Sequence, residues 1–292
     1  MPVTRSSARV AAVGSLGGLV LLLAAPVAAA ATDSVTNGSF QAPGTNGGDP
    51  TGWTATTLGA ETAPFRASIA TYDTTGQFPP PAGTPGGDTA GNFASEAFYQ
   101  VGSGTGVIGY GGRQVLATPV SSTSAPKLGF STVESFFPSS TKVSWAGAVV
   151  QLDLSSGTST YTLRYVAPFA AGGYSGTPSD QDTATTKTVV LPAIPAKVWS
   201  STAGRDVATD ASARLGLAGF TITAVTYGDL ENRTSAGGSP FPNITTYWKN
   251  VSLTTGDTLP TALPDAAQAV LLPLAGLGGL ATVTAARRSR RA

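Results

Sequence analysis

The sequence STYTLRYVAPF, residues 159–169, has the period of a β-strand. Tyr161, Leu163 and Tyr165 occupy every second position, with polar or β-branched residues between them. Successive side chains of a strand point to opposite faces, so this spacing places the three large side chains on one face. The stretch therefore predicts a strand with one face in a hydrophobic core.

Several other stretches share this richness in Thr, Val, Tyr, Phe and Ile. Residues 218–230 (AGFTITAVTYGDL) alternate through Phe220, Ile222 and Ala224. Residues 142–154 (KVSWAGAVVQLDL) alternate at first and are then apolar throughout, as a central strand can be. The remaining strand candidates are residues 127–134, 187–194 and 246–254.

Gly, Pro, Ser and Asn separate these stretches, and helical periodicity is nearly absent. Residues 73–91 and 170–186 are predicted loops, because proline and glycine dominate them. Only residues 211–217 favour a helical turn. Short strands between turn residues are typical of an all-β sandwich or barrel. We predict such a fold for residues 32–256, as one large domain or two small ones.

The composition excludes many kinds of catalytic site. The chain has no cysteine and no histidine, so it can form no disulfide, thiolate nucleophile, Ser-His-Asp triad or histidine-ligated metal site. Carboxylate chemistry, hydroxyl chemistry and oxygen-ligated calcium remain. Residues 33–265 contain 11 basic and all 16 acidic residues, spread singly, which leaves no basic surface for a nucleic acid.

Residues 1–31 have the three-part layout of an export signal. Two arginines precede an apolar run over residues 10–23, and three alanines follow at residues 28–30. This layout is typical of a secretory signal peptide, with cleavage after Ala30 or Ala31. The alternative is an uncleaved anchor helix, but the apolar run is shorter than the ~20 residues that span a bilayer.

The other end of the chain predicts a membrane anchor. Residues 266–286 are 21 positions without a charge, and four arginines lie in residues 287–292. This length suffices for a transmembrane helix, and the arginines would hold the tail in the cytoplasm. Residues 257–265 would link the anchor to the extracellular domain. The alternative, a buried apolar helix, is disfavoured by Pro273 and three nearby glycines.

Just before the anchor, residues 263–267 (LPDAA) resemble the sortase sorting signal of Gram-positive surface proteins, and the apolar span and basic tail extend that resemblance. Sortase cleaves that signal between Thr and Gly, whereas Ala266 and Ala267 stand at those positions here. The resemblance implies a protein on the surface of a Gram-positive, actinobacterial cell. We predict retention in the membrane, with covalent attachment to the cell wall as the alternative.

Both ends of the predicted domain resemble the galactose-binding-like jelly roll of many carbohydrate-binding modules. The resemblance rests on VTNGSFQ at residues 35–41, on Gly52-Trp53, and on YWKNVSL at residues 247–253. It implies a jelly-roll β-sandwich whose first and last strands lie close together.

Such neighbouring end strands would turn the apolar residues of both motifs toward the core. These residues are Val35 and Phe40 at the start, and Val251 and Leu253 at the end. Trp53 would seal the same core, since tryptophans are mostly buried.

The same resemblance bears on calcium. In that family a structural calcium is commonly held by a Glu in the first motif and an Asp in the last, and here those positions are Gln41 and Lys249. A lysine ammonium would repel the ion. We therefore predict no metal site, and no cofactor.

Ligand recognition on such a domain needs aromatic faces and a few hydrogen-bonding side chains on a rigid sheet. The exposed candidates are four aromatic residues and one arginine, namely Trp199, Trp248, Tyr110, Tyr174 and Arg113. Trp199 follows Pro195 in a predicted loop, although packing is the commoner role of a tryptophan. Tyr247 and Trp248 are adjacent, so one of them faces away from the core.

Carboxylate catalysis would need two acids on either side of one bond. Asp229 and Glu231 lie two residues apart on a predicted strand, and Glu134 ends another. Near turns, such acids are expected to be solvated surface charges. The sequence therefore favours a protein that is not an enzyme.

We predict a secreted, membrane-tethered surface protein whose β-sandwich binds a glycan or another surface ligand. Two alternatives stay open: a structural or adhesive surface protein without a small-molecule site, and a carboxylate-dependent glycoside hydrolase. Aromatic residues clustered with polar groups on a solvent-facing sheet would favour binding. Two acids roughly 5 to 10 Å apart in a cleft would favour hydrolysis.

Overall fold

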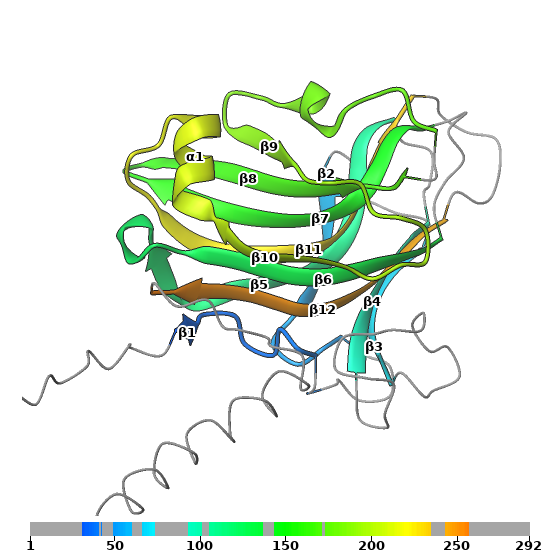
Figure 1. Cartoon of the computed structure of the whole chain (residues 1–292), viewed down its shortest axis with the longest axis horizontal. Coiled ribbons are helices and arrows are strands. Elements are labelled where there is room, and N and C mark those ends of the chain that lie inside the picture. Colours follow the sequence, from blue (N-terminus) through cyan, green and yellow to red (C-terminus); the bar gives the residue numbers. More distant parts are fainter. Residues whose placement is uncertain are drawn as a thin grey trace, which may run out of the picture.

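Two packed β-sheets with a short α-helix beside them make up the fold (Figure 1). The computed structural model describes residues 31–40, 42, 49–59, 66–73, 93–100, 105–136, 143–170, 173–234 and 243–256. Apart from Ala31, the predicted signal peptide, linker, anchor and basic tail lie outside these residues. Within them, no helix has the length and apolar character to span a membrane.

The first sheet, sheet A, has the strand order β10-β6-β12-β4-β3, and β1 also pairs with β12. Its strands are β1 (Thr32–Asp33), β3 (Arg66–Asp73), β4 (Phe93–Gln100), β6 (Lys127–Phe136), β10 (Ser200–Asp206) and β12 (Asn243–Thr255). All of these pairs are antiparallel.

The second sheet, sheet B, has the order β2-β5-β11-β7-β8-β9. Its strands are β2 (Thr54–Gly59), β5 (Gly106–Ser121), β7 (Val143–Ser156), β8 (Ser159–Pro168), β9 (Thr186–Val190) and β11 (Thr221–Arg233). Only β8 and β9 pair in parallel, and the other described pairs of sheet B are antiparallel.

Most of the predicted strands are confirmed. The candidates at 127–134, 142–154, 159–169, 218–230 and 246–254 correspond to β6, β7, β8, β11 and β12. The candidate at 187–194 is the shorter β9, followed by an isolated bridge between Phe169 and Ile194. The two-residue turn between β7 and β8 uses Gly157 at φ 61°, a backbone angle that tight hairpins need.

The sequence pattern missed β2, β3, β4, β5 and β10. The longest of them, β5 (GVIGYGGRQVLATPVS), contains four glycines, which are depleted in strands. β10 (SSTAGRD) is almost wholly polar. Most of the loop predicted at 73–91 lies outside the described residues; the loop predicted at 170–186 contains the short 3₁₀ helix η4 (Pro178–Gln181).

The predicted helical turn is present and begins earlier than expected. Helix α1 spans Val207–Leu215, because the side chain of Asp206 accepts a hydrogen bond from the Thr209 N–H and caps the first turn. Gly216, at φ 69°, ends the helix. A second 3₁₀ helix, η2 (Ser122–Ser124), follows β5.

The first and last strands pair, as the end motifs predicted. Thr32 and Asp33 of β1 lie opposite Thr255 and Thr254 of β12, and the Asp33 carboxylate accepts a hydrogen bond from the Leu253 N–H at 3.0 Å. The apolar residues of both motifs are buried in the main core: Val35, Phe40, Trp53, Val251 and Leu253.

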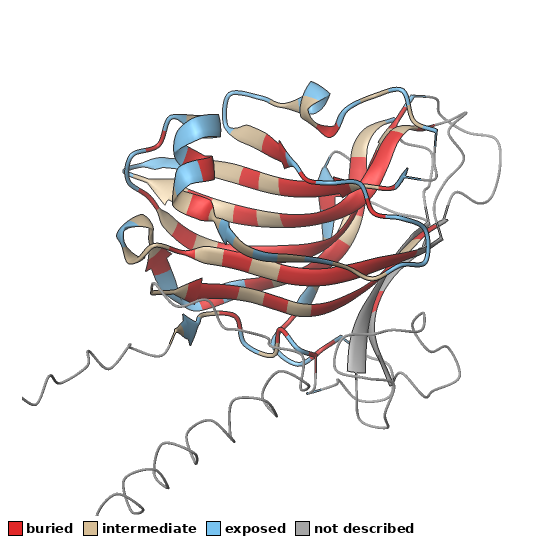
Figure 2. Ribbon diagram, in the orientation of Figure 1, coloured by how far each residue is buried: buried red, intermediate tan, exposed pale blue. Residues whose placement is uncertain are grey.

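Four aromatic rings join the two sheets inside that core. The strands of both sheets carry buried residues along much of their length (Figure 2). The ring of Tyr227 on β11 lies 5.1 Å from Phe40, 4.8 Å from Trp53 and 5.6 Å from Trp248 on β12, between centroids. Aromatic pairs at this spacing each stabilise a fold by about 0.5–1.5 kcal/mol beyond the area they bury.

A β-bulge in β11 corrects one expectation about which side chains face the core. The registers with both β5 and β7 shift between Ile222 and Ala224. Ile222, Val225 and Tyr227 all belong to the main core, so Ala224 does not share their face. One extra residue in a strand exchanges the two faces beyond it. The alternation through Ala224 therefore does not continue, and the odd-numbered residues that follow face sheet A.

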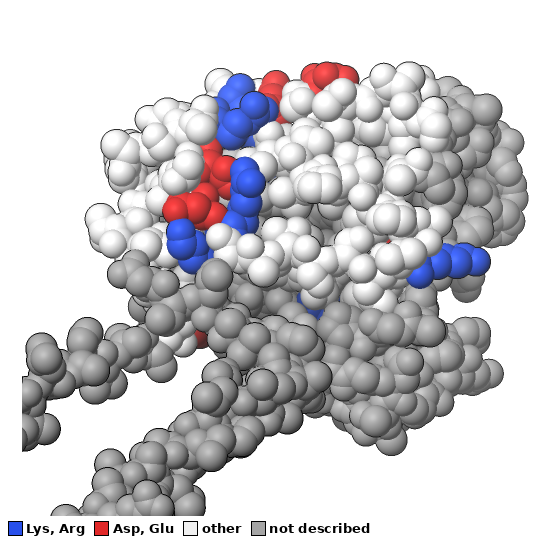
Figure 3. Space-filling model, in the orientation of Figure 1, with Lys and Arg blue, Asp and Glu red and all other residues white. Residues whose placement is uncertain are grey.

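Charged residues gather near α1 on the face seen in Figure 3. Three of the described ion pairs lie there, Lys127–Asp206, Arg205–Asp210 and Arg214–Asp182, with nitrogen–oxygen distances of 2.6 to 2.8 Å. Because each basic group has an acidic partner, these charges fix α1 against its neighbours rather than form a basic surface.

Gly112 on β5 is expected to be required for the aromatic core. A Cβ at this position would lie 2.6 to 2.8 Å from Cε1, Cζ and the hydroxyl oxygen of Tyr227. Gly112→Ala should therefore lower the free energy of unfolding by about 1–3 kcal/mol, as overpacking does. Urea unfolding followed by circular dichroism measures this. Gly219→Ala is the control, because a Cβ there meets no atom within 4 Å; equal effects of the two changes would contradict the prediction.

Candidate functional site

The outer face of sheet B, which faces away from sheet A, carries one row of polar residues across the whole sheet. Each member lies directly opposite the next on the neighbouring strand. From β2 to β9 the row is Thr54, Arg113, Thr226, Gln151, Arg164 and Thr188. Side chains in one row of a sheet are near neighbours, so these groups act together.

Hydrogen bonds connect the centre of this row with Asp153. Arg113 Nη2 donates to Asp153 Oδ2 at 2.7 Å, and Gln151 Nε2 donates to Asp153 Oδ1 at 3.1 Å. Arg164 Nε donates to Gln151 Oε1 at 3.1 Å. The four side chains therefore hold one another in a fixed arrangement, with carboxylate, amide and guanidinium groups in alternation.

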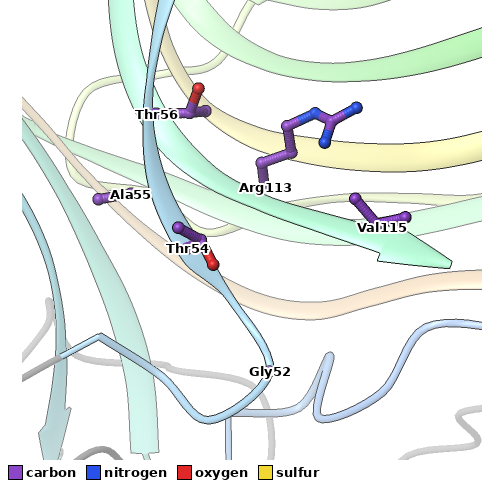
Figure 4. A pocket seen from close by; sticks show the side chains of 6 residues that line it. All are labelled: Gly52, Thr54, Ala55, Thr56, Arg113 and Val115. Carbon is purple, nitrogen blue, oxygen red and sulfur yellow. The ribbon is translucent and has the colours of Figure 1, made fainter. Parts of the chain in front are cut away.

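At the β2 end the row opens into a shallow pocket of about 320 Å³. It is lined by Gly52, Thr54, Ala55, Thr56, Arg113 and Val115. Figure 4 shows Arg113 and Val115 projecting side by side from β5, opposite the residues of β2. Val115 is 66% exposed, the largest exposed fraction among the big hydrophobic side chains described.

The β8 end of the row is more enclosed. Burial lowers the pKa of Arg164, and the carboxylates of Asp182 and Asp153 oppose this shift. Asp182 is itself held by Arg214 of α1, with Nη2 and Oδ2 2.8 Å apart. A ligand would therefore approach the row from the Arg113 side.

Threonine hydroxyls, a guanidinium and an exposed valine give this pocket donors, acceptors and an apolar surface. Sites for small molecules combine apolar surface with a few well-placed polar groups. Arg113 is the only charged residue among those that line the pocket, so this arrangement suits binding better than acid–base chemistry.

A second set of polar residues lies between the sheets. Asp229 and Glu231 of β11 are 0% exposed, and Glu134 of β6 is 1% exposed. Thr246 Oγ1 of β12 donates to Asp229 Oδ1 at 2.5 Å and accepts from Trp248 Nε1 at 2.6 Å. This chain of hydrogen bonds links the two sheets beside the aromatic core.

Burial and nearby charges shift the pKa values of Glu134 and of Tyr174. Burial raises the pKa of Glu134, and the backbone N–H and the ammonium of Lys197 oppose the rise. Burial also raises the pKa of Tyr174, and the negative charges of Glu231 and Glu134 raise it further. Tyr174 and the two glutamates therefore lie in one electrostatic environment.

The acids correct the sequence analysis, which expected solvated surface charges. Asp229 and Glu231 face inward because the bulge at Ile222 and Ala224 exchanges the faces of β11. Glu134 lies opposite Thr246 and so shares its inward face. Asp229 and Glu231 follow Tyr227 at intervals of two residues, so strand alternation places all three side chains on one face. The sequence predicts their burial only if Tyr227, and not Ala224, marks the core face.

The five predicted ligand-binding residues do not come together. Arg113 lines the pocket, whereas Trp248 is 0% exposed in the core, so its expected exposure is wrong. Tyr247, its neighbour, faces the outside of sheet A instead, next to Val133. Strand alternation allowed either choice, and the register of β12 decides it.

The other three candidates are partly buried. Tyr110 lies opposite Asp229 on the inward face of β5, where burial and the charge of Asp49 raise its pKa. Tyr174 packs against core residues on both sides of sheet B. Trp199 packs against Val133 and Tyr247 on the outer face of sheet A. Sequence reasoning missed Asp153, Gln151 and Arg164, because only the register places them beside Arg113.

The calcium positions implied by the jelly-roll resemblance are only partly described. Gln41 lies outside the described residues, and Lys249 is buried on β12. In the part of the chain that is described, no group of three or more acidic side chains is arranged to hold a metal ion.

No family model and no curated protein matches this chain. Among solved structures, it is similar to the Stig cyclase Fisc from Fischerella sp. TAU, with 11% identity and a TM-score of 0.34 over 77% of this chain and 97% of that one. It is also similar to a carbohydrate-binding module of the β-sandwich superfamily, with 10% identity and a TM-score of 0.31 over 73% of this chain and 63% of that one.

A third similar structure is an exo-beta-agarase, with 13% identity and a TM-score of 0.34. This chain matches only 26% of the agarase, over 79% of its own length. Likenesses this distant carry no argument about the activity or ligand of the chain.

The buried Glu134 predicts a pH-dependent stability. A carboxyl group with a raised pKa in the folded state destabilises that state as it ionises, so the free energy of unfolding should fall as the pH rises above the usual value of 4.5. Glu134→Gln removes this ionisation. Relative to the wild type, the variant should gain stability as the pH rises above 4.5, as urea unfolding at several pH values would show.

The matched control is Asp206→Asn, because the Lys127 ammonium and the Thr209 N–H lower the pKa of Asp206. Its ionised form stabilises the fold, so the control should lose stability relative to the wild type as the pH rises. A Glu134→Gln difference that stays constant with pH would contradict the prediction.

Proposed function

We propose that this protein is an exported cell-surface protein whose β-sandwich binds a glycan without catalysis, at the pocket around Arg113. The observation that carries this proposal is the open pocket on the outer face of sheet B, where Arg113 and the exposed Val115 lie beside threonine hydroxyls. A sheet face is rigid, so ligand binding there loses little conformational entropy.

The chemistry of the row suits the hydroxyl groups of a saccharide. Each hydroxyl can both donate and accept a hydrogen bond. Arg113 and Gln151 supply donors, and Asp153, Gln151 and the threonines supply acceptors. Val115 offers an apolar surface for the C–H face of a sugar ring.

Export and anchoring complete the proposal. Residues 1–31 would be removed as a signal peptide, and residues 32–256 would form an extracellular sandwich of jelly-roll type. Residues 257–265 would connect it to a membrane helix over 266–286, with residues 287–292 in the cytoplasm.

Changing Arg113 to alanine should weaken glycan binding about tenfold or more, because a charged hydrogen-bond donor contributes about 1.5–3 kcal/mol. The measurement is co-sedimentation of the full chain with insoluble polysaccharides, namely peptidoglycan, cellulose, chitin and xylan. Arg205→Ala is the matched control, since Arg205 on β10 of sheet A also pairs with an aspartate at 2.7 Å and is similarly exposed. Arg205→Ala should bind like the wild type.

If the wild type binds none of these polysaccharides, the structural or adhesive role becomes the better explanation. Equal binding by Arg113→Ala and the wild type would place any glycan site elsewhere on the molecule.

The export proposal predicts the form of the protein in its own cells. The mature chain should begin at Ala31 or Thr32 and should sediment with the membrane fraction. Mass spectrometry of the N-terminal peptide and cell fractionation test this. Replacing the four arginines of residues 287–292 by serine is expected to release part of the protein from the membrane, because the positive charges hold the tail inside. Intact protein starting at Met1 in the cytosol would contradict export.

A further inference from the structure

Three segments without a charged residue form one end of the sandwich, which we call the uncharged end. They are residues 117–126, from the end of β5 to the start of β6, residues 156–159, at the turn between β7 and β8, and residues 216–220, between α1 and β11. Several of their small apolar side chains are exposed, among them Ala117, Pro119 and Ala218.

Hydrogen bonds join the three segments into one surface. The N–H of Ser122 donates to the carbonyl oxygen of Phe220 at 2.9 Å, which connects the first segment with the third. The hydroxyl of Ser156 donates to the carbonyl oxygen of Gly219 at 2.7 Å, which connects the second with the third. The segments are therefore held together, although they are far apart in the sequence.

The described chain also ends here. The N–H of Gly256, directly after β12, donates to the carbonyl oxygen of Ser124 at 3.2 Å. The predicted linker that follows, residues 257–265, can span at most about 30 Å when fully extended. β12 itself (Asn243–Thr255) is about 40 Å long. The linker is therefore too short to bring the opposite end of β12 to the membrane.

Charge also favours this end as the part nearest to a membrane. Residues 33–265 are acidic overall, and bilayers with anionic lipids carry a negative potential that decays over about 8 Å at physiological salt. The basic residues that flank the uncharged end are paired, Lys127 with Asp206 at 2.6 Å and Arg214 with Asp182 at 2.8 Å. The uncharged end can therefore approach such a bilayer with little repulsion.

One carboxylate lies close to this end. Asp33 of β1 is opposite Thr254 of β12, and it accepts hydrogen bonds from two backbone N–H groups. These bonds orient two backbone dipoles toward its charge and so offset part of it.

We propose that the uncharged end rests on the membrane that holds the predicted anchor, with Ala117, Pro119 and Ala218 at the level of the lipid headgroups. The inference rests on the membrane anchor of the proposed function. Contact with lipid would remove these exposed apolar groups from water, which is favourable.

The broad faces of the sandwich suit a membrane less well. The outer face of sheet B carries Arg113, Asp153 and Arg164, and the surface near α1 carries three ion pairs. Laying either surface on lipid would take charged groups out of water, which is costly. The uncharged end carries no such penalty.

This orientation sets the height of the pocket above the membrane. Thr226, the neighbour of Arg113 in the polar row, lies five residues along β11 from Thr221, where that strand begins at the uncharged end. Five residues of a strand span about 17 Å. The pocket would therefore open sideways, within reach of saccharides close to the membrane surface.

The test uses single-cysteine variants, because the natural chain has no cysteine and each variant takes one fluorescent label. Thr118→Cys, Thr158→Cys and Ala218→Cys place the label on the three segments. Val198→Cys is the control, because Val198 is 52% exposed and follows Lys197, whose N–H donates to Glu134 toward the other end of β6.

The labelled full chain is reconstituted into vesicles of phosphatidylcholine and phosphatidylglycerol, with or without lipids that carry a nitroxide on the headgroup. The nitroxide lipids should quench most of the fluorescence of the three labels at the uncharged end and leave that of Val198→Cys unchanged. Three independent sites keep the test decisive if one labelled variant does not fold.

The outcomes separate this inference from the anchor itself. If the protein floats with the vesicles but the four labels are quenched equally, or Val198→Cys most, the orientation is wrong and the anchor stands. If the protein does not float with the vesicles, the anchor fails and the orientation with it. If dimming of the three labels needs no nitroxide and disappears at low protein-to-lipid ratio, a second copy covers this end, and the inference is overturned.

Discussion

The β-bulge between Ile222 and Ala224 determines which residues of sheet B meet the core. β11 is a central strand, paired on both sides over most of its length. Because the bulge exchanges its two faces, Tyr227 enters the aromatic core and Asp229 and Glu231 enter the interior. The same exchange places Thr226 outward, between Arg113 and Gln151, and so completes the polar row. A single backbone irregularity thus orients both the buried polar residues and the outer polar row.

Local sequence patterns predicted the strands that combine alternation with large apolar residues. The strand at Ser159–Pro168 is of this kind, and its Leu163 and Tyr165 are fully buried. β5 was not predicted because its glycines are required by contacts with other strands. Gly112 leaves space for the Tyr227 ring, and Gly109 and Gly111 approach the backbone of β11 closely. A glycine that is needed because a neighbouring strand comes close adds nothing to the hydrophobic pattern of its own segment. The sequence of that segment alone therefore does not reveal the strand.

The candidate site was predictable in type but not in position. Arg113 could be named as a polar partner, yet its partners Asp153 and Gln151 lie some forty residues away and reach it only through strand pairing. Trp248 shows the converse. Its neighbour Tyr247 is as suitable for a core as Trp248 is, and only the pairing of β12 with β6 decides which of the two enters. Pairing register is a property of the whole sheet, so no local pattern contains it.

The sandwich interior has an aromatic end and a polar end, and the packing of the aromatic end allows the polar end to exist. Burying ionisable groups costs several kcal/mol per ion unless partners compensate, and burial raises the pKa of Glu134 accordingly. The stabilising contacts are concentrated at the neighbouring level, where Phe40, Trp53, Tyr227 and Trp248 pack between the sheets and β1 pairs with β12. Trp248 belongs to both ends, because its ring packs on Tyr227 while its indole N–H donates toward Asp229 through Thr246. An aromatic end that holds the sheets together allows the polar end to keep groups that a uniformly packed sandwich would exclude.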